Sequence, residues 1–206
     1  MIDRSPRCLV LDAMGVVFAA PDDVAEILIP FIRSAGSECD AGTIESVYLQ
    51  ASLGIIDADA FWRRVGLDPI VEDAYLSNHR LVAGAREFLE NARQFGLPVW
   101  CLSNDVGRWS RRLRETLGIE RLLAGALISS DAKVRKPDRA IYEQLLVATG
   151  CRPAELLFVD DRAKNVAGAA AIGIPAIEFT GPHIYGPLSA KLFARQSGKL
   201  TRPTTV

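Results

Sequence analysis

The chain has 206 residues, of which 49% are apolar and 24% charged, as is typical of one soluble globular domain with room for a small insertion. Its formal net charge of −1 excludes a strong attraction to nucleic acid or anionic membranes, and the lack of any run of about 18 apolar residues excludes a predicted membrane span. The N-terminus lacks the apolar stretch of a signal peptide and the four cysteines form no CxxC pair, so we expect a cytoplasmic protein.

Short apolar runs recur along the chain and predict the strands of one sheet. In chain order they are CLVLDA (8–13), LPVWCLS (97–103), ALIS (126–129), ELLFVD (155–160) and IPAIEF (174–179). Each run is rich in large apolar residues and ends at a polar or turn residue, which is typical of strands buried on both faces.

Segments with helical periodicity lie between these runs. They cover residues 82–96, 107–119, 137–150 and 163–174. The alternation of strand and helix predicts an α/β fold with a doubly wound parallel sheet and right-handed crossovers. In such a sheet the polar residues that end the strands converge at one edge, which here brings together Asp12, Ser103, Asp160 and Asp161.

Residues 19–81 interrupt this alternation. The stretches DDVAEILIPFIRSAG, AGTIESVYLQASLG and DADAFWRRVG indicate short helices separated by turn residues. We therefore predict a core of residues 1–18 and 82–206, with a helical cap at 19–81 inserted after the first strand. Tyr48, Phe61 and Trp62 are expected to pack the interior of this cap, and one of the three, which the sequence does not identify, is a candidate to line the substrate entrance. The chain after about Gly181 is rich in turn residues, and its end, GKLTRPTTV, is expected to be frayed.

The converging polar residues suggest a site for a metal and an anion. The carboxylates of Asp12, Asp160 and Asp161 would repel one another unless a cation lay among them, and oxygen ligands of this kind suit Mg²⁺. Ser103 and the lysine of VRKPD, Lys136, could then bind a phosphoryl group. Taken singly, the aspartates could equally serve as turn or helix-capping residues.

Four motifs appear in a fixed order: LVLDAMGVV, VWCLSND, VRKPDRAIY and LLFVDDRAKNVAGAAAIGI. Together they resemble the haloacid dehalogenase-like (HAD) hydrolase superfamily, over about residues 6–180. The resemblance implies a Rossmann-like core with a small helical cap that closes on the site and selects substrates. It also implies an aspartyl-phosphate on the first motif's aspartate, Asp12.

The resemblance assigns a role to each matching residue. Asp12 would be the nucleophile, Lys136 would neutralise charge, and Ser103 would hydrogen-bond a phosphoryl oxygen with help from the Asn104 backbone. The Mg²⁺ ligands would be Asp12, Asp161 and the backbone carbonyl of Met14. Asp160 and Asn165 would support these groups.

Position 14 departs from the family's phosphatases, which carry there an aspartate that acts as general acid and base. The thioether of Met14 can do neither, and such assistance is typically worth about 10²–10⁴-fold in rate. Asp22, Asp23 and Asp105 are candidates to replace it, although each is more simply interpreted as a helix cap. Met14 itself is then an apolar residue of the substrate pocket.

The acidic fourth motif, VDDR, favours the metal-dependent phosphatase-like branch over the dehalogenases. We therefore expect a Mg²⁺-dependent phosphatase or phosphotransferase that acts on a small phosphorylated metabolite and is slowed by the loss of the acid at Met14. Two alternatives stay open: a metal-independent haloacid dehalogenase-type hydrolase and a non-catalytic phosphate-binding member. The sequence specifies neither the substrate nor the oligomeric state.

Overall fold

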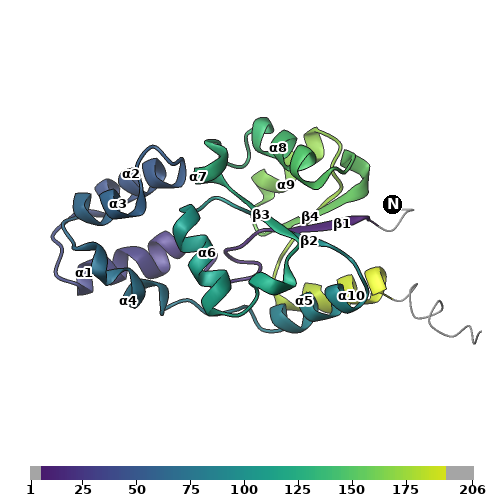
Figure 1. Ribbon diagram of the computed structural model, residues 1–206, viewed down its shortest axis with the longest axis horizontal. Helices are drawn as coiled ribbons and strands as arrows, with labels where there is room; N and C mark the ends of the chain where they lie inside the picture. The colour runs from purple at the N-terminus through teal and green to yellow at the C-terminus, as the bar shows by residue number, and fades with distance from the viewer. Residues whose placement is uncertain (1–5, 194–206) are drawn as a thin grey trace, which may run out of the picture.

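The computed structural model describes residues 6–193 (Figure 1). The predicted frayed end, GKLTRPTTV, lies outside this range. Among the described residues, no helix combines the length and the apolar character needed to cross a membrane.

One parallel sheet of five strands forms the centre of the molecule, in the order β3-β2-β1-β4-β5. The strands are β1 (Cys8–Leu11), β2 (Val99–Ser103), β3 (Gly125–Ile128), β4 (Leu156–Asp160) and β5 (Ala176–Glu178). Each of the five predicted apolar runs contains most or all of one of them, and every pairing is parallel. The predicted doubly wound α/β fold is therefore confirmed.

Helices cover both faces of the sheet, and β1 is buried between them. On one face lie α5 (Ala85–Gln94), α6 (Gly107–Thr116) and α10 (Tyr185–Phe193), and on the other lie α8 (Arg139–Thr149) and α9 (Ala163–Ala171). Successive β1 side chains alternate between two hydrophobic clusters. Leu9 and Leu11 join the first cluster, and Cys8 and Val10 join the second. Short helices α7 (Ser129–Ala132), η3 (Glu120–Leu122), η4 (Pro153–Glu155) and η5 (Pro182–Ile184) complete the connections.

The sequence analysis did not predict α10, because the turn residues after Gly181 obscured it. Tyr185, Leu188 and Leu192 are buried along one side of this helix. The ring of Phe88 on α5 lies 4.9 Å from that of Tyr185 and 5.8 Å from that of Phe193, between ring centroids. The spacing of three and four residues was the signal available in the sequence.

Residues 19–81, hereafter the helical insertion, lie beyond the carboxyl edge of the sheet (Figure 1). Their helices are η1 (Val24–Leu28), α1 (Ile29–Ser34), α2 (Ala41–Ser52), α3 (Ala58–Arg64), η2 (Pro69–Val71) and α4 (Glu72–Leu76). The side chains of Asp40, Asp57 and Asp68 cap α2, α3 and η2. The three predicted helical stretches are present, and η2 and α4 were not predicted.

The aromatic residues of the helical insertion do not form a separate interior. The ring of Trp109, on α6 of the sheet domain, lies 5.0 Å from that of Phe61 and 5.3 Å from that of Trp62. Tyr48 also stacks on Trp109, at 6.4 Å. Phe61 and Trp62 do pack against each other within the insertion, at 5.1 Å, as expected, but the expectation was incomplete because α6 contributes the ring at the centre of the cluster.

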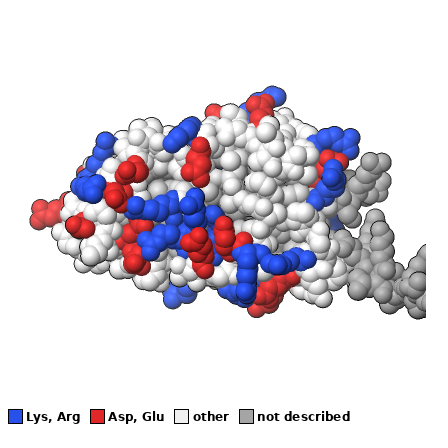
Figure 2. Space-filling view, in the orientation of Figure 1, with Lys and Arg blue, Asp and Glu red and all other residues white. Residues whose placement is uncertain are grey.

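A buried carboxylate joins the same two parts of the chain. Glu72 of α4 accepts hydrogen bonds from the indole N–H groups of Trp62 and Trp109, at 3.2 and 2.7 Å. It also pairs with Arg108 at 2.6 Å and Arg112 at 2.8 Å. Figure 2 shows basic and acidic side chains interleaved over this region. These arginines therefore hold α6 to the helical insertion, a role that their sequence pattern does not reveal.

Candidate active site

The parallel sheet brings the predicted polar residues together at its carboxyl edge. Asp12 follows β1, Ser103 ends β2 and Asp160 ends β4. One carboxylate oxygen from each of Asp12, Asp160 and Asp161 lies within 4.8 Å of the others. Parallel strands produce this convergence because their carboxyl ends all lie at the same edge.

Lys136 lies within this group of carboxylates and is 4% exposed. Its Nζ is 2.7 Å from Oδ1 of Asp12 and 2.7 Å from Oδ2 of Asp160, and it donates a third bond to the Leu102 carbonyl at 2.7 Å. Burial alone would lower the pKa of Lys136, but Asp12 and Asp160 outweigh it and raise the pKa. The lysine is thus a fixed positive charge beside Asp12.

The two aspartates of the fourth motif differ in their contacts. The oxygens of Asp160 accept from Lys136 and from Asn165 Nδ2 (2.9 and 3.1 Å), and Oδ1 also accepts from the Arg162 N–H at 2.9 Å. Burial would raise the pKa of Asp160, but Lys136 outweighs it and lowers the pKa. Oδ1 of Asp161, in contrast, is buried without a hydrogen-bond partner. Asp160 therefore orients its neighbours, whereas Asp161 keeps an oxygen available for a ligand.

The geometry around Asp161 fits a hard divalent cation. Burial, followed by the charge of Asp160, raises the pKa of Asp161, which indicates uncompensated negative charge at this position. Gly15 has a φ of +78°, and a Cβ built on it would lie 2.4 Å from Oδ2 of Asp161. A glycine at this turn therefore leaves space for the carboxylate. The donors are carboxylate oxygens, which suit Mg²⁺ better than a softer metal.

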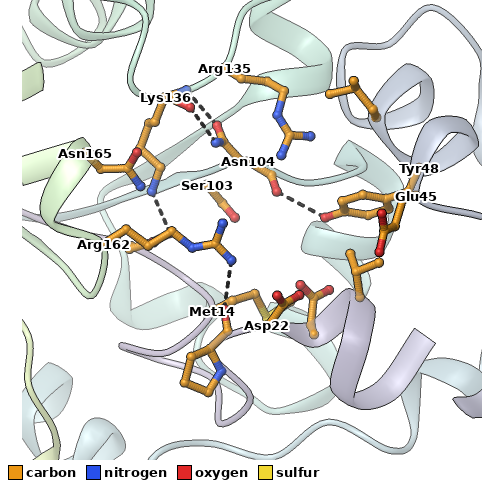
Figure 3. A pocket seen from close by; sticks show the side chains of 15 residues that line it. Met14, Asp22, Glu45, Tyr48, Ser103, Asn104, Arg135, Lys136, Arg162 and Asn165 are labelled. Carbon is orange, nitrogen blue, oxygen red and sulfur yellow. Dashed lines mark hydrogen bonds and ion pairs between the residues drawn. The ribbon is translucent and has the colours of Figure 1, made fainter. Parts of the chain in front are cut away.

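A cavity of about 380 Å³ opens at this edge of the sheet. Figure 3 shows its walls: Met14 and Asp22 lie on one side, and Asn104, Arg135 and Lys136 on the other. The full lining is Asp12, Met14, Pro21, Asp22, Asp23, Val24, Glu45, Tyr48, Leu49, Ser103, Asn104, Arg135, Lys136, Arg162 and Asn165. Asp12, Ser103 and Lys136 thus share one cavity with Met14.

Asn104 links the cavity wall to the helical insertion. Its side chain donates to the Lys136 carbonyl at 2.9 Å and accepts from the Lys136 N–H at 2.8 Å. Its own carbonyl accepts a bond from the Tyr48 hydroxyl at 3.1 Å. The amide of Asn104 therefore orients the loop that carries Lys136.

Sequence reasoning missed three polar residues of the cavity wall, Glu45, Arg135 and Arg162, and did not single out Tyr48 among the three aromatic candidates for the substrate entrance. Two of them had a signal in the sequence, because Arg135 precedes Lys136 and Arg162 follows Asp161. Glu45 and Tyr48 lie on α2, and only the placement of the helical insertion brings them to the cavity.

The three candidate replacements for the acid occupy different positions. Asp22 lines the cavity, and its Oδ1 accepts from the Ala25 N–H at 3.2 Å, as expected of a cap. Asp23 also lines the cavity and occupies the N-cap position of η1, but its side chain makes no capping hydrogen bond. Asp105 is 2% exposed and is not among the lining residues, so it does not contribute to the cavity wall.

Comparison with known proteins places this geometry in a family. Residues 31–173 match the model of the haloacid dehalogenase-like hydrolases. The chain is 33% identical over 85 residues to the sesquiterpene phosphatase astK of Aspergillus oryzae, covering 41% of this chain and 43% of that protein. It is 33% identical over 94 residues to a phosphoserine phosphatase of Thermus thermophilus, covering 45% and 38%. It is 30% identical over 93 residues to (S)-2-haloacid dehalogenase 4A of Burkholderia cepacia, covering 45% and 40%. The matches thus span about two fifths of these relatives' length.

Solved structures share the fold at lower identity. A HAD family enzyme from Bacteroides thetaiotaomicron superimposes with a TM-score of 0.78 at 18% identity, covering 90% of this chain and 98% of that one. The same enzyme in complex with magnesium and inorganic phosphate gives a TM-score of 0.72 at 19% identity, covering 84% and 94%. L-2-haloacid dehalogenase from Xanthobacter autotrophicus gives 0.61 at 21% identity, covering 96% and 85%. Together with this fold, the family model that matches residues 31–173 shows that the chain belongs to the haloacid dehalogenase-like hydrolases.

Proposed function

We propose that this hydrolase is a Mg²⁺-dependent phosphatase or phosphotransferase that acts on a small phosphorylated metabolite. The observation that carries the proposal is the buried oxygen of Asp161 without a partner, beside the paired Asp12 and Lys136. Relatives named as phosphatases and a related enzyme solved with magnesium and inorganic phosphate support it. The cavity of about 380 Å³ suits a small substrate.

Asp12 is the proposed nucleophile. Its Oδ1 accepts from the Ala13 N–H at 2.6 Å and pairs with Lys136, so the carboxylate is held in one orientation before the substrate arrives. It attacks phosphorus and forms an aspartyl-phosphate, which water then hydrolyses. The Ser103 hydroxyl and the Asn104 backbone N–H donate to the phosphoryl oxygens, and Lys136 neutralises their charge.

Asp12, Asp161 and the backbone carbonyl of Met14 are the residues we propose as Mg²⁺ ligands. The bound ion would neutralise charge on the phosphoryl group. Asp160 and Asn165 leave the ligands free by holding Lys136 and the start of α9. In this proposal the helical insertion is the family's cap, and its Glu45, Tyr48 and Leu49 contact the part of the substrate that departs.

A dehalogenase is the second candidate, because Met14 is apolar and two of the matched proteins are haloacid dehalogenases. In that reaction Asp12 would attack carbon instead of phosphorus. The oxygen of Asp161 without a partner would then have no function, which favours the phosphatase. A phosphate-binding protein without turnover would keep the same cavity. Only an activity assay distinguishes it from the two enzymes.

The deciding experiment is the hydrolysis of p-nitrophenyl phosphate with Mg²⁺ and with EDTA, using Asp12→Asn as control. Turnover that needs Mg²⁺ and is absent from the variant supports a phosphatase. Release of halide from a 2-haloacid in EDTA supports a dehalogenase. Phosphate binding in calorimetry, with wild type and variant equally inactive on both substrates, identifies a binding protein and refutes the proposal.

A further inference from the structure

Transfer of a phosphoryl group from an alkyl ester expels a strongly basic alkoxide. The reaction is fast only if a neighbouring acid protonates the leaving oxygen, and the same group can later accept a proton from the attacking water. Met14 lines the cavity but has no proton to give. Another acid of the cavity wall must supply this function if the protein hydrolyses unactivated esters.

Asp23 is placed to do so. It lines the same cavity as Asp12, Met14 and Ser103, and it is 5% exposed. Asp23 occupies the N-cap position of η1, but its side chain makes no capping hydrogen bond, and its Oδ2 is buried without a hydrogen-bond partner. The adjacent Asp22 differs, because its carboxylate is engaged by the Ala25 N–H. A buried carboxyl oxygen without a hydrogen-bond partner lowers the stability of the fold. A role in the reaction is therefore the simpler explanation for Asp23.

We propose that Asp23 is the catalytic acid and base of this enzyme, in place of the side chain that Met14 has replaced. The proposal rests on the proposed phosphatase function and adds to it the group that moves the proton. It also implies a substrate class, namely phosphate monoesters of unactivated alcohols, because only these require the acid.

The electrostatic surroundings of Asp23 agree with this role. Burial, followed by the charge of Asp22, raises the pKa of Asp23 to about 7, against the opposing effect of Arg162. A group that must give a proton and then take one back works best with a pKa near the working pH. The titratable groups around it are Asp22, Arg162, Asp105, Tyr48 and Tyr75.

Asp105 lies outside the cavity lining and feels the charge of Asp23. Burial, followed by the charge of Asp23, raises the pKa of Asp105 to about 8. Its Oδ2 is also buried without a partner. Of the two carboxyls, Asp23 has the lower pKa, so it is the one that releases and takes back a proton near neutral pH.

The proton balance of the two steps is complete. In the first, an Asp12 oxygen bonds to phosphorus, the bond from phosphorus to the ester oxygen breaks, and that oxygen takes the Asp23 proton to leave as the alcohol. In the second, water bonds to phosphorus and gives a proton to the Asp23 carboxylate, and the bond from phosphorus to Asp12 breaks. Inorganic phosphate leaves, and both aspartates return to their starting states.

The test compares esters with different leaving groups. We expect Asp23→Asn to lower kcat/KM by about 10²–10⁴-fold for an alkyl phosphate such as glycerol 3-phosphate, and by less than about tenfold for p-nitrophenyl phosphate, whose leaving group needs no proton. The limb of the wild-type pH profile near the Asp23 pKa should disappear in the variant. Asp22→Asn is the comparison variant for the pH profile: it keeps the Asp23 carboxyl but removes the charge that raises its pKa, so it should move this limb to lower pH without abolishing it.

Equal losses on both esters, or an unchanged pH profile in Asp23→Asn, would overturn the proposal. If the variant does not fold, the wild type alone decides: a steep fall of kcat/KM with the basicity of the leaving group means that no acid assists. Asp12→Asn separates the two proposals. If it abolishes turnover while Asp23→Asn changes nothing, the phosphatase assignment stands and the role of Asp23 is refuted; if wild type is inactive on every ester, both fail.

Discussion

The buried carboxyl of Asp105 should make stability depend on pH in a way that a single substitution removes. Its pKa rises from 3.8 to about 8 in the folded protein, chiefly through burial. Between these values the folded protein keeps a proton that the unfolded chain has lost, so the free energy of unfolding falls as pH rises. Asparagine is neutral at every pH, and its amide oxygen can still accept the Val106 N–H bond, which is 2.6 Å long in the wild type.

The magnitude follows from one proton. Each pH unit inside this window lowers the free energy of unfolding by up to about 1.4 kcal/mol, so the wild type should lose about 3 kcal/mol relative to Asp105→Asn between about pH 5 and pH 7. Titrating groups that do not interact with Asp105 cancel in the difference, and below about pH 7 the side chain at position 105 is neutral in both folded proteins, so Asp23 contributes little to that difference. Urea unfolding in EDTA, followed by tryptophan fluorescence, measures the two curves. Parallel curves would refute the reasoning, because they would mean that Asp105 ionises normally in the folded state.

Three further predictions concern the metal site and its surroundings. Gly15→Ala and Gly36→Ala both place alanine at positive φ (+78° and +88°), but only the Cβ at position 15 meets the Asp161 carboxylate. Calorimetry should therefore show Mg²⁺ affinity reduced in the first variant alone, whereas each loses about 1–2 kcal/mol of stability; equal affinities would contradict the metal site. Lys136→Met removes the positive charge between the buried carboxylates of Asp12 and Asp160 and should lower the free energy of unfolding by about 3–5 kcal/mol, measured by urea unfolding with EDTA. A loss below about 1 kcal/mol would mean that the ion pairs contribute little. Glu72→Gln removes the charge that pairs with two arginines and should cost about 2 kcal/mol and shift the tryptophan emission; an unchanged spectrum would show that the indole environment does not depend on Glu72.

The sheet and the polar edge could be predicted because their composition is tightly constrained. A strand with helices on both faces, such as β1, must be apolar almost throughout, so it appears in the sequence as an uninterrupted run. The residue at which that run stops must lie at the edge of the sheet. Asp12, Ser103 and Asp160 were found in this way, because the parallel topology leaves one edge for all of them.

The remaining features depend on contacts between segments far apart in the sequence. Arg108 and Arg112 form a charged helix face like any solvated one until α4 places Glu72 against it. Asp22 and Asp23 are adjacent and chemically identical in the sequence. Only the packing of η1 gives the Asp22 carboxylate a backbone N–H donor and leaves Oδ2 of Asp23 buried without a partner. Periodicity and motif order carry no information about such partners.

The aromatic cluster around Trp109 also determines how the protein can be re-engineered. A chimera that exchanged only residues 19–81 for the corresponding segment of another family member would leave Trp109 without the rings of Phe61 and Trp62 and without the Glu72 carboxylate. The transplantable module is therefore the helical insertion together with the outer face of α6. Libraries that recombine these two segments jointly should yield folded variants far more often than libraries with a junction at the ends of the insertion.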